Sequence, residues 1–358
     1  MPETEVIFHK SVSIRPLPAN FNRADMNIFE HEFRREIPET VLKYFSNVTV
    51  YPEGLLFNGT KILEESFPAP EFSASWLGIK VRAKALLKYK FKERRPISAN
   101  SIWVTDTLSH NYFHWLTDVL PRLFIVRDKL QETTLLLPSS YQSKCYVASS
   151  LKPFFLREIE FVDKVACCTN LMIPTHTAPT GNYNESVITG VRELYINSYN
   201  KSSTINDFEK VYISRGKAQK RTLSNEADCI AVLEEFGFKT IYFEDYSFEQ
   251  QVEMISNTQY LISNHGSGLA NMLFMNSNGQ VLELRQEGDS LNNCFFALAS
   301  ALRLKYFYQL CNSQNPGEDA NTADLVVDCR LLRENIERML GDSNKRLQKS
   351  IQSLENSS

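Results

Sequence analysis

The sequence contains no apolar run of the ~18 residues that a membrane-spanning helix requires. Its start carries acidic side chains and prolines where a signal peptide would have a basic region and then an apolar segment. We therefore expect a cytoplasmic protein without an integral membrane segment. The expected location becomes the lumen of the secretory pathway if a signal or anchor precedes this sequence in a longer chain.

Cysteine, glycine, proline and net charge are all low. The seven cysteines are irregularly spaced without a Cys-x-x-Cys pair, which argues against a disulfide framework and a zinc site of usual spacing. With 13 glycines and 14 prolines in 358 residues, collagen-like and low-complexity proteins are excluded. The net charge of −3 disfavours a nucleic-acid partner.

The remaining composition is that of an ordinary globular protein, with 43% hydrophobic and 23% charged residues. At about 100–200 residues per domain, the length indicates roughly two domains. From residue 101 onward, strand-like and helix-like segments alternate, which predicts mostly parallel sheets covered by helices. The expected strands are 101–106, 133–138, 158–162, 171–175, 210–215, 238–244, 259–263, 280–284 and 304–310.

A polar segment, 201–209, separates two such series and is the best candidate for a linker. We therefore predict an α/β fold with an N-terminal domain at 1–204 and a C-terminal domain at 205–358. In open α/β sheets ligands bind beyond the carboxyl ends of the strands, so the loops after strands are the places to search for a site.

The loop after the strand at 259–263 reads His265-Gly266-Ser267-Gly268 and runs directly into a helix. Its glycines allow a close backbone approach, and free N–H groups at a helix start bind anions. This pattern fits a diphosphate, although glycine-rich turns of purely structural function are equally common.

The loop after the strand at 210–215 is basic and carries Arg215, Lys217, Lys220 and Arg221. Arginine forks match phosphate oxygens two at a time. A solvated basic loop is the alternative. Because this loop and the glycine-rich turn both follow strands of the same half, we predict that they bind one phosphorylated ligand together.

His110, His114 and Asp118 recur at intervals of four residues, which places them on one face of a helix predicted at 110–130. Two histidines and a carboxylate are conceivable metal ligands, but the HExxH pattern is absent. A His–Asp pair that activates an acceptor hydroxyl is the preferred interpretation, and a structural carboxylate is the alternative for Asp118.

Three familiar active-site motifs are missing. Ser267 stands in HGSG rather than G-x-S-x-G, so a nucleophile elbow is not supported. Neither GxxxxGK[ST] nor G-x-G-x-x-G occurs, which disfavours P-loop enzymes and dinucleotide oxidoreductases.

Three blocks in this order resemble glycosyltransferase family 61, and the resemblance covers roughly residues 100–310. The blocks are FHWLTDVLPRLF (113–124), YISRGKAQKRTLSNE (212–226) and SFEQQVEMISNTQYLISNHGSGLANMLFM (247–275), followed by VLEL (281–284). That family includes plant xylosyl- and arabinosyltransferases, N-acetylglucosaminyltransferases and bacterial proteins linked to capsular polysaccharide synthesis. The first hundred residues match nothing in it.

The resemblance implies a GT-B-like arrangement, with two Rossmann-like domains and a cleft between them, whose final helix in many such folds packs back onto the first domain. It also implies inverting transfer from a nucleotide sugar, usually a UDP-sugar, to a glycan or other hydroxyl acceptor, with no metal and no other cofactor. His114 and Asp118 match the catalytic positions of the first domain. On the donor side, the resemblance covers Arg215, Arg221, Asn225, His265, Gly266, Gly268, Leu269 and Asn271, and Glu283, a suspected ribose contact, matches only part of the family. Ser267 stands where alanine is commoner and could add a hydroxyl donor near the phosphates. Lys220, from the basic loop, completes the predicted donor-binding set.

The sequence thus predicts a metal-independent, inverting glycosyltransferase. The alternative is a catalytically inactive glycan- or nucleotide-binding protein with a transferase fold. The sugar, the nucleotide, the acceptor and the oligomeric state are left open, as is the choice between Asp118 and His114 as the base.

Overall fold

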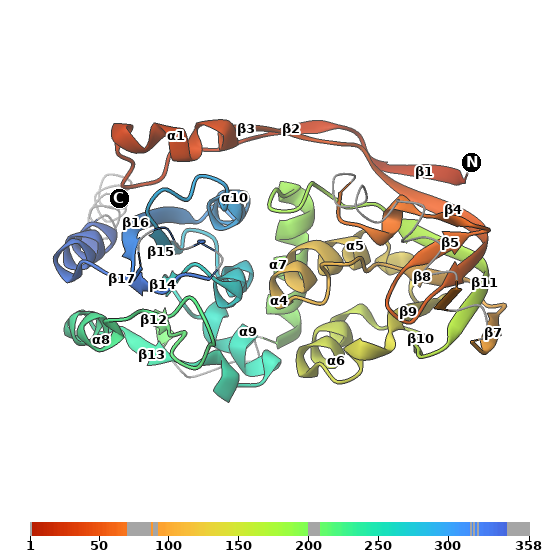
Figure 1. Cartoon of the computed structure of the whole chain (residues 1–358). Helices are drawn as coiled ribbons and strands as arrows, with labels where there is room; N and C mark the ends of the chain where they lie inside the picture. The colour runs from red at the N-terminus through yellow and green to blue at the C-terminus, as the bar shows by residue number, and fades with distance from the viewer. Residues whose placement is uncertain are drawn as a thin grey trace, which may run out of the picture. The chain divides into compact units, whose positions relative to one another are not determined.

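The computed structural model describes residues 2–69, 87–88, 92–199, 208–315, 317, 319–320 and 322–341. The chain divides into two compact units, which are described separately (Figure 1). The first contains Met1–Ile14, Arg34–Tyr199 and Ser247–Glu249, and the second contains Arg15–Phe33, Asn200–Tyr246 and Gln250–Ser358. Of the linker predicted at 201–209, residues 201–207 lie outside the described part.

The sheet of the first unit is mixed rather than mostly parallel. Among the described residues it has nine strands, in the order β10-β9-β8-β11-β4-β5-β6, with β1 paired to β4 and β7 to β11. The parallel strands are β10 (Glu158–Val162), β9 (Thr134–Pro138), β8 (Ser101–Trp103), β11 (Val165–Pro174) and β7 (Arg94–Ile97). The antiparallel strands are β4 (Thr40–Val50), β5 (Leu56–Asn58), β6 (Lys61–Ile62) and β1 (Glu3–Phe8).

The antiparallel part comes from the first hundred residues. Short turns join β4 to β5 and β5 to β6, and strands joined by short turns must pair antiparallel because a parallel pair needs a long crossover. Gly59, with φ of +60°, supports the turn between β5 and β6. A separate two-stranded sheet is formed by β2 (Ser11–Ile14) and β3 (Arg34–Ile37).

Helices α4 (Tyr112–His114), α5 (Leu120–Ile125), α6 (Cys145–Leu151) and α7 (Glu185–Tyr199) complete the first unit. Gly190 lets α7 approach α5 closely, because a Cβ there would stand 2.7 Å from Cε1 of Phe124. One core cluster joins β4, β5, β8, β9 and β11 around the fully buried Trp103.

The second unit has a sheet in the order β13-β12-β14-β15-β16-β17 among the described residues, and its first five strands are parallel. These strands are β13 (Lys239–Ile241), β12 (Lys210–Ile213), β14 (Tyr260–Asn264), β15 (Gln280–Gln286) and β16 (Lys305–Ser313), and β17 (Leu325–Val326) adds antiparallel. This is the flavodoxin-like order 2-1-3-4-5. The chain order reverses between β12 and β14, and that reversal fixes where a ligand is expected.

Helices α8 (Glu226–Glu235) and α10 (Cys294–Ala301) belong to this unit, as does α9 (Phe248–Ser256) from Gln250 onward. The core of the second unit includes Leu332, Ile336 and Met339 from the helical residues 329–341. The final described helix therefore packs into the core of its own unit, whereas the resemblance also allowed for packing on the first domain. Asp328 caps it, since its Oδ1 accepts the N–H of Arg330 at 2.9 Å.

Residues 15–33 belong to the second unit, although they lie close to the start of the chain. The ring of Phe29, on α1 (Met26–Phe29), is fully buried and meets the rings of Phe296 and Tyr308 with centroids 5.2 and 4.9 Å apart. The side-chain amide of Asn20 donates to the carbonyl of Tyr308 at 2.7 Å. The earliest part of the sequence thus completes a core built from the latest part.

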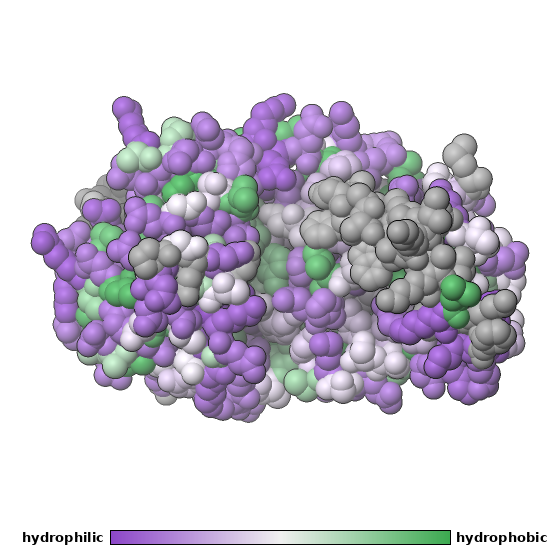
Figure 2. All heavy atoms as spheres, viewed as in Figure 1, coloured by the Kyte–Doolittle hydropathy of each residue, from purple (hydrophilic) through white to green (hydrophobic). Residues whose placement is uncertain are grey.

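The visible face of the molecule is mainly hydrophilic, with apolar residues in small separate groups (Figure 2). The most exposed large apolar side chains, Leu291, Phe155 and Ile14, lie on three different segments. Single exposed apolar residues are normal on globular proteins. In the part of the chain that the structure describes, no helix is long and apolar enough to cross a membrane.

Candidate functional site

The helix predicted at 110–130 is interrupted. A short α4 capped by Asn111 is followed by a π-helix at Trp115–Val119 and then by α5. Pro121 explains part of this break, because proline has no N–H to bond back to the carbonyl four residues earlier. π-Helical turns are rare and are often found at functional sites.

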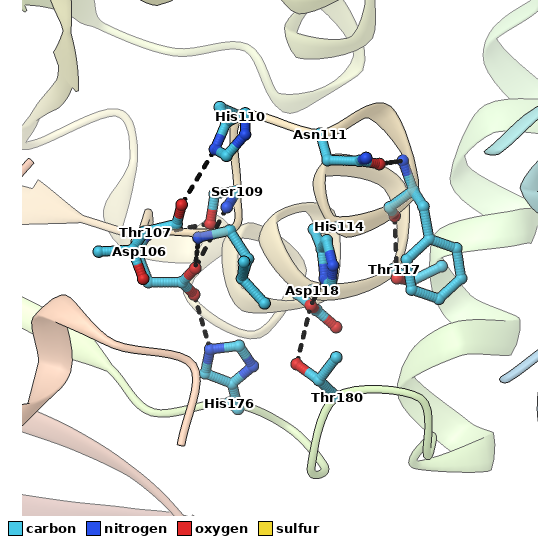
Figure 3. A network of polar contacts seen from close by, with 12 residues as sticks. Asp106, Thr107, Ser109, His110, Asn111, His114, Thr117, Asp118, His176 and Thr180 are labelled. Atoms are coloured by element: carbon cyan, nitrogen blue, oxygen red, sulfur yellow. Dashed lines mark hydrogen bonds and ion pairs between the residues drawn. The ribbon is translucent and has the colours of Figure 1, made fainter. Parts of the chain in front are cut away.

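The π-helical turn brings His114 and Asp118 together. The Nδ1 atom of His114 lies 2.8 Å from Oδ2 of Asp118, and the hydroxyl of Thr180 donates to the same oxygen at 3.1 Å (Figure 3). The Asp118 side chain is only 4% exposed, against 16% for the imidazole. A buried carboxylate held by two donors beside a partly exposed ring can pass or hold a proton at the surface of this cluster.

A second His–Asp pair lies beside the first (Figure 3). The Nε2 atom of His176 is 2.9 Å from Oδ2 of Asp106, and Arg122 lies 3.5 Å from the same oxygen. Burial alone would raise the pKa of Asp106, but the hydrogen bond and charge of His176, with the charge of Arg122, hold it at about 2. The carboxylate is therefore ionised throughout the physiological range.

The sequence interpretation missed Asp106, His176 and Thr180. The sequence could have indicated two of these residues. Asp106 ends the predicted strand 101–106, and His176 directly follows the predicted strand 171–175. Strands β8 and β11 are parallel, so both residues lie at the same edge of the sheet. No sequence signal marks Thr180, which lies in the loop before α7.

His110 takes no part in either pair, since its Nδ1 bonds to the carbonyl of Thr107 at 3.0 Å. Arg122 donates from Nε to the carbonyl of Pro174 at 3.0 Å. Within the described residues, no group of three or more His, Cys, Asp or Glu side chains is arranged to hold a metal ion.

In the second unit, the two predicted phosphate loops leave neighbouring strands. Ile213 at the end of β12 is paired with Ser263 of β14, so the loops that begin at Arg215 and His265 start at the same level of the sheet. This is the point at which the strand order reverses, where ligands of doubly wound sheets bind. The structure thus brings together the two loops that the sequence predicted to converge.

Arg215 and Arg221 form a half-buried cationic pair at this point. Burial, and then the charge of Arg221, lower the pKa of Arg215 to about 10, which still leaves it charged at pH 7. Its guanidinium donates to the backbone carbonyls of Arg221 at 3.2 Å and Lys220 at 3.1 Å. Within the described residues, neither guanidinium is paired with a carboxylate, and Nε of Arg221 is buried without a hydrogen-bond partner. Glu244 acts on Arg215 only as a nearby charge, and two partly desolvated cations without a paired carboxylate among the described residues favour a bound anion.

The side chain of Arg215 packs closely against Gly266. The φ of Gly266 is 171°, which any residue adopts, but a Cβ would stand 2.8 Å from Cζ of Arg215. The turn then enters a 3₁₀-helix, Ser267–Phe274. The arginine fork and the N–H groups at the start of this helix therefore belong to one small region.

His265 is held by a buried carboxylate. Its Nδ1 bonds to Glu283, whose other oxygen accepts the hydroxyl of Tyr306 at 2.6 Å. Burial opposes ionisation of Glu283, yet the charge and hydrogen bond of His265 keep its pKa below the ordinary value. Because the Glu283 side chain is fully buried and both oxygens are engaged, it orients His265, and the ribose contact implied by the resemblance has no exposed oxygen to make it.

The remaining predicted donor residues differ in what they can reach. The amide of Asn225 is bonded at both ends to the backbone of Val327, at 2.9 and 3.0 Å, which fastens the start of α8. Leu269 and Asn271 are fully buried, backbone included. Lys220 is exposed, and Ser267 and Gly268 are partly exposed within the turn.

The fold and the two clusters define a class. Each unit is an α/β body whose polar side chains gather where parallel strands end, as in proteins that bind and transform small ligands there. Within the chain, residues 112–282 match the model of the Glycosyltransferase 61 family. The family resemblance predicted from the sequence is thereby confirmed for this segment.

Curated relatives match a shorter segment. Protein O-linked-mannose beta-1,4-N-acetylglucosaminyltransferase 2 of Homo sapiens is 34% identical over 79 residues, which are 21% of this chain and 14% of the relative. The protein of that name from Xenopus tropicalis is 37% identical over 82 residues, 22% of this chain and 14% of the relative. The aligned part is thus a small fraction of the length of these relatives.

Proposed function

We propose that this protein is an inverting glycosyltransferase that moves a sugar from a nucleotide sugar, with UDP as the first choice of nucleotide, to a hydroxyl of a glycan. One observation carries the proposal. The Arg215–Arg221 pair, without a carboxylate partner among the described residues, lies at the strand-order reversal of an α/β sheet within a family 61 segment. The family match alone supports glycosyl transfer in general.

On the donor side, Arg215, Arg221 and the turn at Gly266 hold the diphosphate. Charge builds up on the phosphate oxygen that leaves the anomeric carbon, and preorganised cations and amides stabilise it. We propose that the arginines take over the task for which other transferases use a divalent cation. His265, oriented by Glu283, donates a further hydrogen bond to the same anion.

On the acceptor side, Asp118 is the proposed base. The acceptor oxygen forms a bond to the anomeric carbon while the bond from that carbon to the phosphate oxygen breaks. The proton of the acceptor hydroxyl passes to Asp118, and the nucleoside diphosphate leaves with the electron pair. His114 lies 2.8 Å from Oδ2 of Asp118 and is the second candidate.

His176 is a third candidate for the base, because Asp106 orients its ring. In the same way, His114 and Thr180 hold Asp118 in place. Transfer requires that the acceptor and the donor sugar meet, so we propose the GT-B arrangement of the two units for the working enzyme. The cytoplasmic location and the metal independence remain predictions.

The first experiment is a thermal-shift screen of the whole protein against UDP, GDP, CMP and their sugars, including UDP-N-acetylglucosamine and UDP-xylose. Binding raises the melting temperature by mass action, so the true nucleotide gives the largest shift. Hydrolysis and transfer are then followed by release of UDP, with and without a chelator.

The outcomes separate the candidate functions. Transfer that survives the chelator supports the proposal, whereas loss of activity overturns metal independence. Strong nucleotide or glycan binding without turnover identifies the inactive binding protein. No shift with any nucleotide rejects the donor site.

A further inference from the structure

A hollow lies on the sheet of the first unit, at some distance along the strands from the two His–Asp pairs. It has a volume of about 850 Å³, within the usual range of ligand pockets. Asn100, which lines it, precedes β8, whereas Asp106 follows the other end of the same strand. The hollow is therefore a separate place on this unit.

The pairing of β4 with β11 builds its floor. Tyr44 is opposite Met172 and Ser46 is opposite Asn170, so these four side chains share one face of the sheet. The residues between them, Phe45 and Leu171, point to the core on the other face. Antiparallel strands commonly leave one face to solvent, and here the solvent face is polar and hollowed.

Five of the twelve described residues that line the hollow carry a neutral amide or hydroxyl, and five others are apolar. The Asn170 amide donates to Oδ1 of Asn100 at 3.2 Å, and the Asn58 amide donates to the carbonyl of Ser46 at 3.2 Å. Each asparagine amide has two donor hydrogens and two acceptor lone pairs, so these single bonds leave capacity for a ligand. Sugar hydroxyls, which also donate and accept, match such amides.

The charge at the hollow is nearly balanced. Among the described residues, the charged ones that line it are Lys61 and Glu3. One cation beside one anion does not suit a diphosphate, which calls for several cationic or N–H donors. Tyr44 supplies a ring whose face fits the C–H surface of a sugar.

We propose that this hollow, defined by Tyr44, Ser46, Asn58, Asn100, Asn170 and Met172, binds a neutral oligosaccharide. Resting on the proposed function, we assign it to the part of a glycan acceptor remote from the reacting hydroxyl. Binding of the remote part of the glycan raises the effective concentration of the reacting hydroxyl at the two His–Asp pairs. A long acceptor then has a lower KM than a short one, with a similar kcat.

Binding is tested first without a nucleotide. Chitotetraose and xylotetraose are titrated into the whole protein and followed by saturation-transfer NMR and calorimetry. The double variant Asn100→Ala/Asn170→Ala should raise the Kd at least about tenfold, because two hydrogen bonds of roughly 1 kcal/mol each are lost. Asn257→Ala, an exposed asparagine of the second unit, is the matched control and should leave the Kd unchanged.

A second variant, Ser46→Trp, fills the hollow without removing an amide and should also abolish binding. Melting curves by circular dichroism confirm that each variant is folded, as expected for exposed polar positions. UDP should not displace the oligosaccharide. Displacement by UDP, or equal Kd values for the double variant and the unsubstituted protein, would overturn the proposal.

Two further results would also overturn it. One is the absence of binding of either probe up to about 10 mM, where a Kd of about 1 mM is readily detected. The other is a clear preference for an anionic oligosaccharide such as a heparin tetrasaccharide. Failure of the proposed transferase function is distinguishable, because it appears as absent turnover of any nucleotide sugar and leaves oligosaccharide binding intact.

Discussion

The guanidinium of Arg215 lies directly on the backbone of Gly266, so close that a Cβ at residue 266 would stand 2.8 Å from Cζ and 3.1 Å from Cδ. Gly266→Ala should therefore push the arginine out of place. Because a displaced fork loses its charge-assisted contact, we expect UDP affinity to fall about tenfold or more by calorimetry.

The same substitution should change stability little, since a flexible side chain moves rather than the backbone. Gly341→Ala is the control, because a Cβ at that position meets no atom within 4 Å. Equal UDP affinities for the two folded variants would show that the Arg215–Gly266 contact has no part in donor binding.

Arg215→Ala should weaken nucleotide binding by roughly 1.5–3 kcal/mol, about 10- to 150-fold, and raise the donor KM. Arg215→Lys keeps the charge but loses the fork, and should recover only part of the affinity. Lys217→Ala, in the same loop, removes a cation already paired with Asp245 at 2.6 Å. If all three variants bind UDP equally well, the phosphate site lies elsewhere.

Asp118→Asn keeps the shape of the side chain and removes its basicity. Turnover should fall by about two or more orders of magnitude with donor affinity nearly unchanged. Thr180→Val is the matched control, because it removes only the hydroxyl that donates to Asp118 at 3.1 Å. A folded Asn variant with near-normal turnover would move the role of base to His114 or His176.

Asp106 should make the first unit sensitive to acid. Its pKa is about 2 in the folded protein against an ordinary value of 3.8, so its stabilising effect is complete above pH 4 and is lost as the pH falls toward 2. Asp106→Asn should lower the free energy of unfolding by about 2 kcal/mol at pH 7.

The difference between this variant and the unsubstituted protein should shrink between pH 4 and pH 2. Urea unfolding followed by tryptophan fluorescence measures this difference in the free energy of unfolding. The buried Trp103 and Trp115 both lie in the first unit and report on it. A difference that stays constant through this range would mean that the carboxylate is not specially stabilised.

Glu283→Gln removes the carboxylate that accepts from both His265 and Tyr306. We expect lower UDP affinity, because His265 loses its orientation, and a stability loss of about 1–3 kcal/mol from an unsatisfied buried group. Tyr306→Phe removes the hydroxyl that donates to Glu283 at 2.6 Å but leaves the bond between His265 and Glu283, so it should reduce stability while leaving most of the UDP affinity. Identical UDP affinities in both variants would assign Glu283 a structural role alone.

Sequence patterns located the strands of the second unit well. Strands predicted at 259–263 and 280–284 are found at Tyr260–Asn264 and Gln280–Gln286, because buried parallel strands are short apolar runs bounded by turn residues. The interrupted helix around His114 was not foreseen, since its hydrophobic pattern is that of an ordinary helix. Pro121 was the one visible sign of a break.

The residues predicted on loops after strands lie at neighbouring strand ends in the structure, and their binding roles stay predictions. Arg215 and His265 were placed by strand ends alone, whereas Asn225, Leu269 and Asn271 were included for the family pattern and are engaged or buried in the structure. Side chains such as Asp106 and His176, 70 residues apart, meet only through the strand order of a folded sheet. That strand order includes β4, which comes from the first hundred residues, where the sequence shows no recognisable motif.

The packing of residues 15–33 on the second unit has a consequence for synthesis in the cell. Asn20 leaves the ribosome first, but Tyr308, to which it bonds, is made 288 residues later. At about 5–20 residues per second, that interval is roughly 15–60 s. During that time Phe29 lacks the aromatic neighbours that bury it. The nascent chain should therefore depend on chaperones for longer than a protein whose domains follow one another in sequence.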